Sequence, residues 1–339
     1  MRNHEITEKQ LLLNEEGNLR EPGWSRAMVQ RYRRADIKAP AWRIKEWDYY
    51  LVMGSDFALC LTLNDMGYLG MISVSLVDFS VPREHTETIL TPFPMGKFRM
   101  PEQTEAGKAS FCNDRVKICF TVKDGIRRLK CRLKNFEDGK DLECDVTLTQ
   151  PEGDSIVIAT PWEQPRRFYY NHKISGMPAS GYVTVGDVRR EFDPAQDLGL
   201  LDWGRGVWTY KNTWYWGSGS GYVDGKRVGF NIGYGFGDTS AASENVIFVD
   251  GKAHKLDDVT FHIPEEDYCA PWKFTSSDGR FEMDFVPIID RSSRTDVKLI
   301  VSDQHQVFGR MNGRMILDDG SAIELKDFLC FAEKVFNQY

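Results

Sequence analysis

Short runs of mixed apolar and polar residues dominate this chain of 339 residues. The runs at 56–65, 68–79, 115–124 and 143–150 are rich in β-branched or aromatic residues. Successive side chains of a strand point to opposite faces, so alternating runs of this length and composition predict β-strands. The dipeptide Asp-Gly occurs six times and is among the best short signals for a hairpin turn, because both central residues of a type I′ turn need a positive φ. These pairs stand at 124–125, 138–139, 224–225, 250–251, 278–279 and 319–320.

Helical patterns are scarce. Residues 25–37 fit one short helix capped by Ser25, and residues 325–336 fit either a last strand or a terminal helix. Closely spaced strands without intervening helices of 10–15 residues favour antiparallel barrels or sandwiches over a βαβ fold. The sequence therefore predicts an all-β protein with few short helices.

The length exceeds that at which one hydrophobic core normally stops growing, so two domains are expected. The stretch 159–181 contains three prolines and interrupts the alternation. We place the joint there and expect an N-terminal β-barrel domain at 1–175 and a C-terminal one at 176–339.

The composition is 41% hydrophobic and 27% charged, with a net charge of −7. This is typical of a soluble globular protein and argues against binding to nucleic acid or anionic membranes. No stretch approaches the roughly 18–20 apolar residues that span a bilayer. None of the seven cysteines has CxxC spacing, which favours reduced thiols and a cytoplasmic location.

The segment 200–237 contains ten aromatic residues and ten glycines in 38 positions. If 229–237 is a strand, Phe230, Ile232, Tyr234 and Phe236 share one face, and the other face carries only glycines and Asn231. A bare strand face indicates the close approach of a neighbour, which is either a bulky side chain or a ligand.

Several familiar sites are missing from the sequence. Gly217, Gly219 and Gly221 form GxGxG rather than GxGxxG and do not open a helix, which argues against a dinucleotide cofactor. There is no nucleophile elbow, and the six histidines form neither HxH nor HExxH. We therefore expect no cofactor and no metal.

Asp202 is the candidate catalytic residue, because it lies between an apolar run and a cluster of tryptophans. A carboxyl group in such surroundings tends to keep its proton, since desolvation penalises its charged form, and it can then act as a general acid. Arg205 is expected to orient or pair with Asp202. The alternative is structural, with Asp202 held by Arg205 or by backbone groups of a turn.

The candidate ligand-binding residues are mostly aromatic. Trp208, Tyr210, Trp214 and Trp216 share parity, and could line a pocket for a flat apolar ligand or stabilise a cation through their π faces. They fit a packed barrel core equally well. The full set is Trp203, Trp208, Tyr210, Trp214, Trp216, Asn231, Glu244 and His172.

Six segments resemble a bacterial family known only as a domain of unknown function: 169–181, 200–221, 228–238, 243–256, 267–274 and 305–313. The signature is LLDWGRGVW followed by NTWYWGS. More remotely, the Asp-Trp-Gly element is similar to one in proteins of two lipocalin-like barrels, among them carotenoid hydratases, tocopherol cyclases and pericyclase-like enzymes. That resemblance implies two barrels, an apolar pocket and acid chemistry without a redox cofactor at Asp202. The hydratase motif is incomplete here, because no histidine precedes Trp203.

Three functions follow as hypotheses. The first is a double barrel that binds an apolar or aromatic small molecule, with hydration, dehydration, isomerisation or cyclisation catalysed by Asp202, which would make it a lyase or an isomerase. The second is a carrier with the same pocket and no chemistry. The third is a carbohydrate-active β-sandwich, which requires solvent-exposed tryptophans and two carboxylates about 5–10 Å apart.

Overall fold

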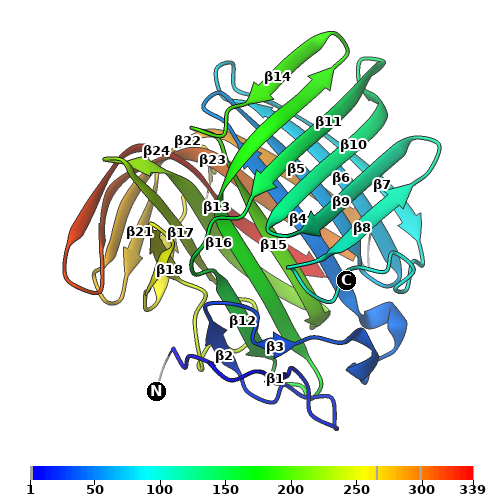
Figure 1. The fold of residues 1–339 in the computed structure, drawn as a ribbon, viewed down its shortest axis with the longest axis vertical. Coiled ribbons are helices and arrows are strands. Elements are labelled where there is room, and N and C mark those ends of the chain that lie inside the picture. Colours follow the sequence, from blue (N-terminus) through cyan, green and yellow to red (C-terminus); the bar gives the residue numbers. More distant parts are fainter. Residues whose placement is uncertain (1–2, 265, 298–299, 339) are drawn as a thin grey trace.

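The computed structural model describes residues 3–264, 266–297 and 300–338. Nearly all of its regular structure is β, and the helical part described consists of two short 3-10 turns, η1 (Arg34–Asp36) and η2 (Ala41–Arg43). Two large antiparallel sheets curl into half-barrels that pack against each other (Figure 1). The predicted all-β fold of two lipocalin-like barrels is confirmed.

The first sheet runs in the order β7-β6-β5-β4-β15-β13-β11-β10-β9-β8, with β2, β12 and β14 paired off this path. Its strands are β2 (Gly23–Ser25), β4 (Lys45–Met53), β5 (Phe57–Asp65), β6 (Leu69–Asp78), β7 (Arg83–Pro92), β8 (Gly107–Cys112), β9 (Val116–Lys123), β10 (Ile126–Glu137), β11 (Lys140–Thr149), β12 (Ile156–Pro161), β13 (Phe168–Val185), β14 (Val188–Phe192) and β15 (Leu198–Val207).

The second sheet runs in the order β19-β18-β17-β16-β24-β23-β22-β21-β20. Its strands are β16 (Lys211–Val223), β17 (Lys226–Tyr234), β18 (Val246–Val249), β19 (Lys252–Lys255), β20 (Val259–His262), β21 (Trp272–Ser276), β22 (Phe281–Val297), β23 (Ile300–Ile316) and β24 (Ala322–Gln338). A small parallel pair, β1 (Gln10–Leu11) and β3 (Gln30–Arg31), lies in the N-terminal segment below the sheets in Figure 1.

Each sheet encloses its own hydrophobic core, and further buried clusters lie between the sheets. Strand β15 separates the first core from the interface, and all ten of its residues are buried. Leu201 and Trp203 point into the first core, whereas Leu200 packs in a cluster shared with the second sheet. The two faces of β15 therefore belong to two different environments.

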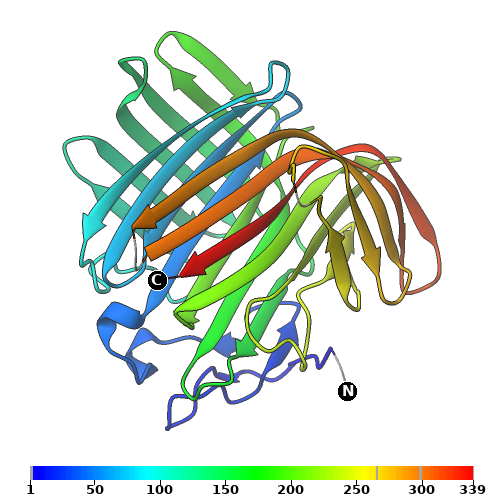
Figure 2. The same ribbon diagram turned by 180° about the vertical axis from the view of Figure 1, so that it is seen from behind.

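The chain passes from the first sheet to the second between Val207 and Lys211. The position 175/176, where the sequence placed the domain boundary, lies inside the 18-residue strand β13. Figure 2 shows the second sheet from behind, with its last strand crossing toward the first sheet.

Four of the six Asp-Gly pairs form the predicted hairpin turns with positive φ at both residues, at Asp124, Asp138, Asp224 and Asp250 and the glycines that follow them. They join β9 to β10, β10 to β11, β16 to β17 and β18 to β19. Residues 325–336 lie in β24 and are strand, one of the two alternatives.

The helix predicted at 25–37 is wrong. This segment contains the end of β2, then β3 and η1. Ser25 pairs with Val157 of β12 in the sheet, and its hydroxyl donates to the carbonyl of Ala27 instead of capping a helix. Pairing with distant strands overrides the local helical pattern. Within the described ranges, no helix is long and apolar enough to cross a bilayer.

Candidate functional site

Asp202 lies on the face of β15 that is turned toward the second sheet. It is 7% exposed and stands directly opposite Lys173 of β13 in the register of the two strands. The Lys173 Nζ atom is 3.2 Å from Asp202 Oδ1, to which the Asn171 amide also donates. Trp47 Nε1 donates to the other oxygen at 3.2 Å. Both carboxylate oxygens of Asp202 are therefore occupied by donors from neighbouring strands.

Lys173 extends from the first sheet to side chains of the second. Its Nζ atom is 3.5 Å from Glu244 Oε2 and 3.9 Å from the ring centroid of Trp216. Burial alone would lower the pKa of Lys173, but the charges of Asp202 and Glu244 outweigh it and raise that pKa. A charged ammonium thus bridges the two sheets.

Glu333 of β24 is a third buried carboxyl group beside this lysine. It is 4% exposed and accepts hydrogen bonds from Trp214 Nε1 and Gln306 Nε2, each at 2.9 Å. Burial raises the pKa of Glu333 to about 7, against the opposing hydrogen bond of Trp214 and the charge of Lys173. A pKa close to the working pH is the value best suited to general acid–base catalysis.

Two glycines admit the side chains of this cluster. A Cβ atom on Gly204 would lie 2.2 Å from carbons of the Trp47 indole, and one on Gly233 would lie 2.6 Å from Glu244 Oε1. The neighbour that approaches the strand closely is therefore a side chain at both positions, Trp47 at Gly204 and Glu244 at Gly233. The glycines let Trp47 reach Asp202 and let Glu244 reach Lys173.

Five of the residues singled out from the sequence meet in this cluster between the sheets: Asp202, Trp214, Trp216, Asn231 and Glu244. Asn231 connects two of them, because its Oδ1 atom accepts from Trp216 Nε1 at 2.7 Å and its amide donates to the Glu244 backbone oxygen at 2.9 Å. They come from both sheets, so the pairing of the half-barrels assembles the cluster.

Arg205 does not pair with Asp202, which corrects the interaction expected from the sequence. Its guanidinium donates to Asp48 Oδ1 at 2.9 Å and to the carbonyl of Pro101 at 2.9 Å. Positions 202 and 205 differ in parity, so their side chains leave β15 on opposite faces.

Trp203 and His172 also lie away from Asp202. Trp203 packs in the core of the first sheet. The His172 ring bonds to Thr104 and Ser155, at 2.8 and 2.7 Å, and burial lowers its pKa to about 3. His172 is therefore a neutral, hydrogen-bonded core residue.

The remaining aromatic candidates lie at one end of the interface. Trp208 contacts Phe236, which is surrounded by four rings whose centroids lie 4.6–5.4 Å away, those of Trp162, Tyr169, Trp208 and Trp214. Tyr210 is 47% exposed.

Sequence reasoning did not select Lys173, Glu333, Asn171 or Trp47. The sequence contains only a weak indication of these residues. Lys173 stands in the otherwise apolar and aromatic run FYYNHKI, where a charged residue implies a partner.

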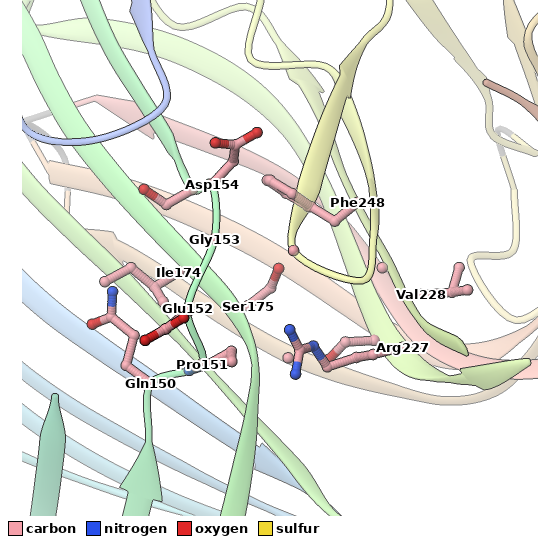
Figure 3. A pocket seen from close by; sticks show the side chains of 15 residues that line it. Gln150, Pro151, Glu152, Gly153, Asp154, Ile174, Ser175, Arg227, Val228 and Phe248 are labelled. Carbon is pink, nitrogen blue, oxygen red and sulfur yellow. The ribbon is translucent and has the colours of Figure 1, made fainter. Parts of the chain in front are cut away.

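The space between the sheets is narrow. A cavity between Ser175 of β13 and Arg227 of β17 has a volume of about 30 Å³. Figure 3 shows side chains that border it. That is room for about two water molecules, whereas pockets for organic ligands span roughly 300–1,000 Å³. In the described part of the chain, no group of three or more His, Cys, Asp or Glu residues is arranged to hold a metal ion.

The sequence matches the family described as a domain of unknown function (DUF2804) over residues 3–339, and the chain belongs to that family. No curated protein sequence matches it. The fold is similar to that of kievitone hydratase from Nectria haematococca, with a TM-score of 0.53 and 11% identity over 97% of this chain and 98% of the other. It is also similar to a putative AttH protein from Nitrosomonas europaea, with a TM-score of 0.52 and 12% identity over 86% and 92% of the two chains.

Proposed function

We propose that this member of the DUF2804 family binds an apolar or aromatic small molecule between its two half-barrels and catalyses a cofactor-independent hydration, dehydration, isomerisation or cyclisation. The observation that carries the proposal is Glu333, a buried carboxyl group with a pKa raised by burial to about 7, set among tryptophans beside a buried lysine. Kievitone hydratase shares the fold.

Glu333 suits the role of general acid better than Asp202. Asp202 is bound directly by the Lys173 ammonium, whereas the side chains that donate to Glu333, Trp214 and Gln306, are neutral. Asp202 then holds Lys173 in place, and the charges of Arg291 and Lys173 both act on Glu333.

The reaction would begin with transfer of the Glu333 proton to one carbon of a substrate double bond. The adjacent carbon becomes cationic, and an indole face stabilises such a cation. Trp214 is placed for this role, because its ring packs against Phe236 and its Nε1 atom donates to Glu333. In hydration, water adds to the cation and gives up its extra proton to the Glu333 carboxylate, and dehydration is the reverse of these steps. In cyclisation, an internal nucleophile closes a ring and a proton is lost to the same carboxylate. In isomerisation, a neighbouring C–H proton returns to it and leaves a shifted double bond.

The substrate would enter where Phe236 now lies. This ring is held by four aromatic neighbours and is flanked by Gly235 and Gly237, with φ of 92° and 91°. The two glycines can absorb a change of backbone angles, so the segment can withdraw Phe236 and leave an aromatic-walled space.

The test begins with small molecules that copurify with the native protein, identified by mass spectrometry and returned to it as substrates. Glu333→Gln is expected to lower turnover about 10²–10⁴-fold while binding, followed by tryptophan fluorescence, persists. Full turnover in this variant would exclude Glu333 as the acid. A ligand recovered unchanged from the wild-type protein would instead favour the carrier function.

The carbohydrate-active alternative gains less support. It requires exposed tryptophans in the aromatic segment, but Trp203, Trp208 and Trp216 are at most 6% exposed and Trp214 is half-buried.

A further inference from the structure

The interior of the first half-barrel holds a second set of buried charges, separate from the Lys173 cluster. Arg127 of β10 is 1% exposed and lies on the inward face of its strand together with Leu129 and Cys131. An arginine at such a position needs acceptors for its five N–H groups, because burying a charge without partners is costly.

Arg127 has few such partners. Its Nη2 atom donates to the Thr104 carbonyl at 2.9 Å, while Nε and Nη1 are buried without an acceptor. Among the residues that the structure describes, no carboxylate lies within 4.0 Å of this guanidinium.

Arg205, in the same half-barrel, shows the contrast. It is 0% exposed and bonds to Asp48 and to the carbonyls of Trp47, Gly204 and Pro101. Glu46, the neighbouring buried carboxylate, is engaged by Arg34 at 2.6 Å. Asp48 is therefore paired with Arg205 and Glu46 with Arg34. Neither carboxylate neutralises the charge of Arg127.

A cavity of about 10 Å³ is lined by Asp48, Tyr50, Thr104, Val122 and Trp203 among others. Arg127 reaches its border, because the guanidinium donates to the Thr104 carbonyl. Val122 is the cross-strand neighbour of Arg127. The indole N–H of Trp203, like two nitrogens of Arg127, is buried without an acceptor. The unmet groups here are donors, and the cavity has room for about one water-sized group.

We propose that Arg127 is the centre of a binding site for one small monovalent anion inside the first half-barrel. Arg127 supplies the positive charge and two donors, its Nε and Nη1 groups. The Trp203 indole N–H supplies a third donor, and the Tyr50 hydroxyl can supply a fourth. Asp48 also lines the cavity and would repel an anion, but its Oδ1 atom is engaged by the Arg205 guanidinium at 2.9 Å, which offsets its charge. The size of the cavity favours a halide over sulfate or phosphate.

The anion would stabilise the folded state, because it binds the folded chain and not the unfolded one. The probe is chloride, exchanged for gluconate at constant ionic strength and pH while thermal unfolding is followed. Wild-type protein is expected to unfold at a temperature about 2 °C or more higher in chloride. Arg127→Met should abolish that difference.

Arg128→Met is the matched control, because Arg128 is the next residue of the same strand, points outward and pairs with Asp145 at 2.7 Å. It should keep the full chloride response. Equal unfolding temperatures of wild type in the two salts, or a response that survives Arg127→Met, would overturn the proposal.

Bromide-soaked crystals of the wild-type protein give a second measurement that does not depend on the variant folding. An anomalous peak beside Arg127 Nη1 is expected. A water molecule there, without an anomalous signal, would contradict the proposal.

Discussion

The Lys173 ammonium of the first sheet lies 3.5 Å from the carboxylate of Glu244, which precedes β18 of the second sheet. Together with Asp202 on its own sheet, Glu244 holds the charge of this lysine in an interface of aromatic rings. The contact joins the two half-barrels at the place where the Glu333 acid is also found, so assembly and proposed chemistry depend on the same residues.

Replacing Lys173 by Met should destabilise the protein strongly, by about 3–5 kcal/mol, because it leaves two buried carboxylates without their shared partner. Urea unfolding at pH 7 measures the change. Lys226→Met, at an exposed hairpin turn, is the control and should shift stability by less than about 0.5 kcal/mol. A Lys173→Met variant as stable as this control would show that the bridge contributes nothing.

Glu333 should give the stability a recognisable pH dependence. Its pKa is raised from 4.5 to about 7 by burial, so between these values the folded chain keeps a proton that the unfolded chain has lost. Stability therefore falls as pH rises through this window, by at most about 1.4 kcal/mol per pH unit, and this contribution levels off above pH 7.

Unfolding of wild type and Glu333→Gln, measured from pH 4.5 to 8, isolates this slope, because other titrating groups such as His172 contribute equally to both. Superimposable pH profiles would mean that Glu333 does not hold its proton near neutrality.

Gly204→Ala should disrupt the cluster without changing any charged residue. The new methyl group would lie 2.2 Å from the Trp47 indole and must displace it from Asp202. We expect a loss of about 1–3 kcal/mol and a changed near-ultraviolet circular dichroism spectrum. Gly54→Ala serves as the control, because its methyl group would meet other atoms only at 3.4 Å or more.

The parity of β15 illustrates what the sequence can predict. Side chains alternate along a strand, so Asp202 and Arg205 must lie on opposite faces of β15. The sequence alone therefore excludes a direct pair between them once this segment is recognised as a strand. The fold class and four hairpins likewise follow from local patterns. The partners of Asp202 do not, since Lys173 and Trp47 reach it only through the pairing of β15 with β13 and with β4. Which strands pair across a long separation in the chain is decided by tertiary packing, and a local pattern does not reveal it.

Phe236→Ala should open the space proposed for the substrate. Removing a ring packed by four aromatic neighbours is expected to cost about 3–5 kcal/mol, and the cavity should then bind a small aromatic probe such as indole. A rise of the unfolding temperature with indole, absent in the wild type, is the expected result. Phe230→Ala, in the core of the second sheet, should lose similar stability, and an equal response to indole there would show that the effect is not specific to the interface.

The most direct test of the account is a crystal structure with the copurified small molecule bound. We predict that the molecule lies between the two half-barrels, against the Trp214 indole, with a double-bond carbon within reach of the Glu333 carboxyl group. A ligand bound elsewhere, with Phe236 and the Lys173 cluster undisturbed, would contradict the account.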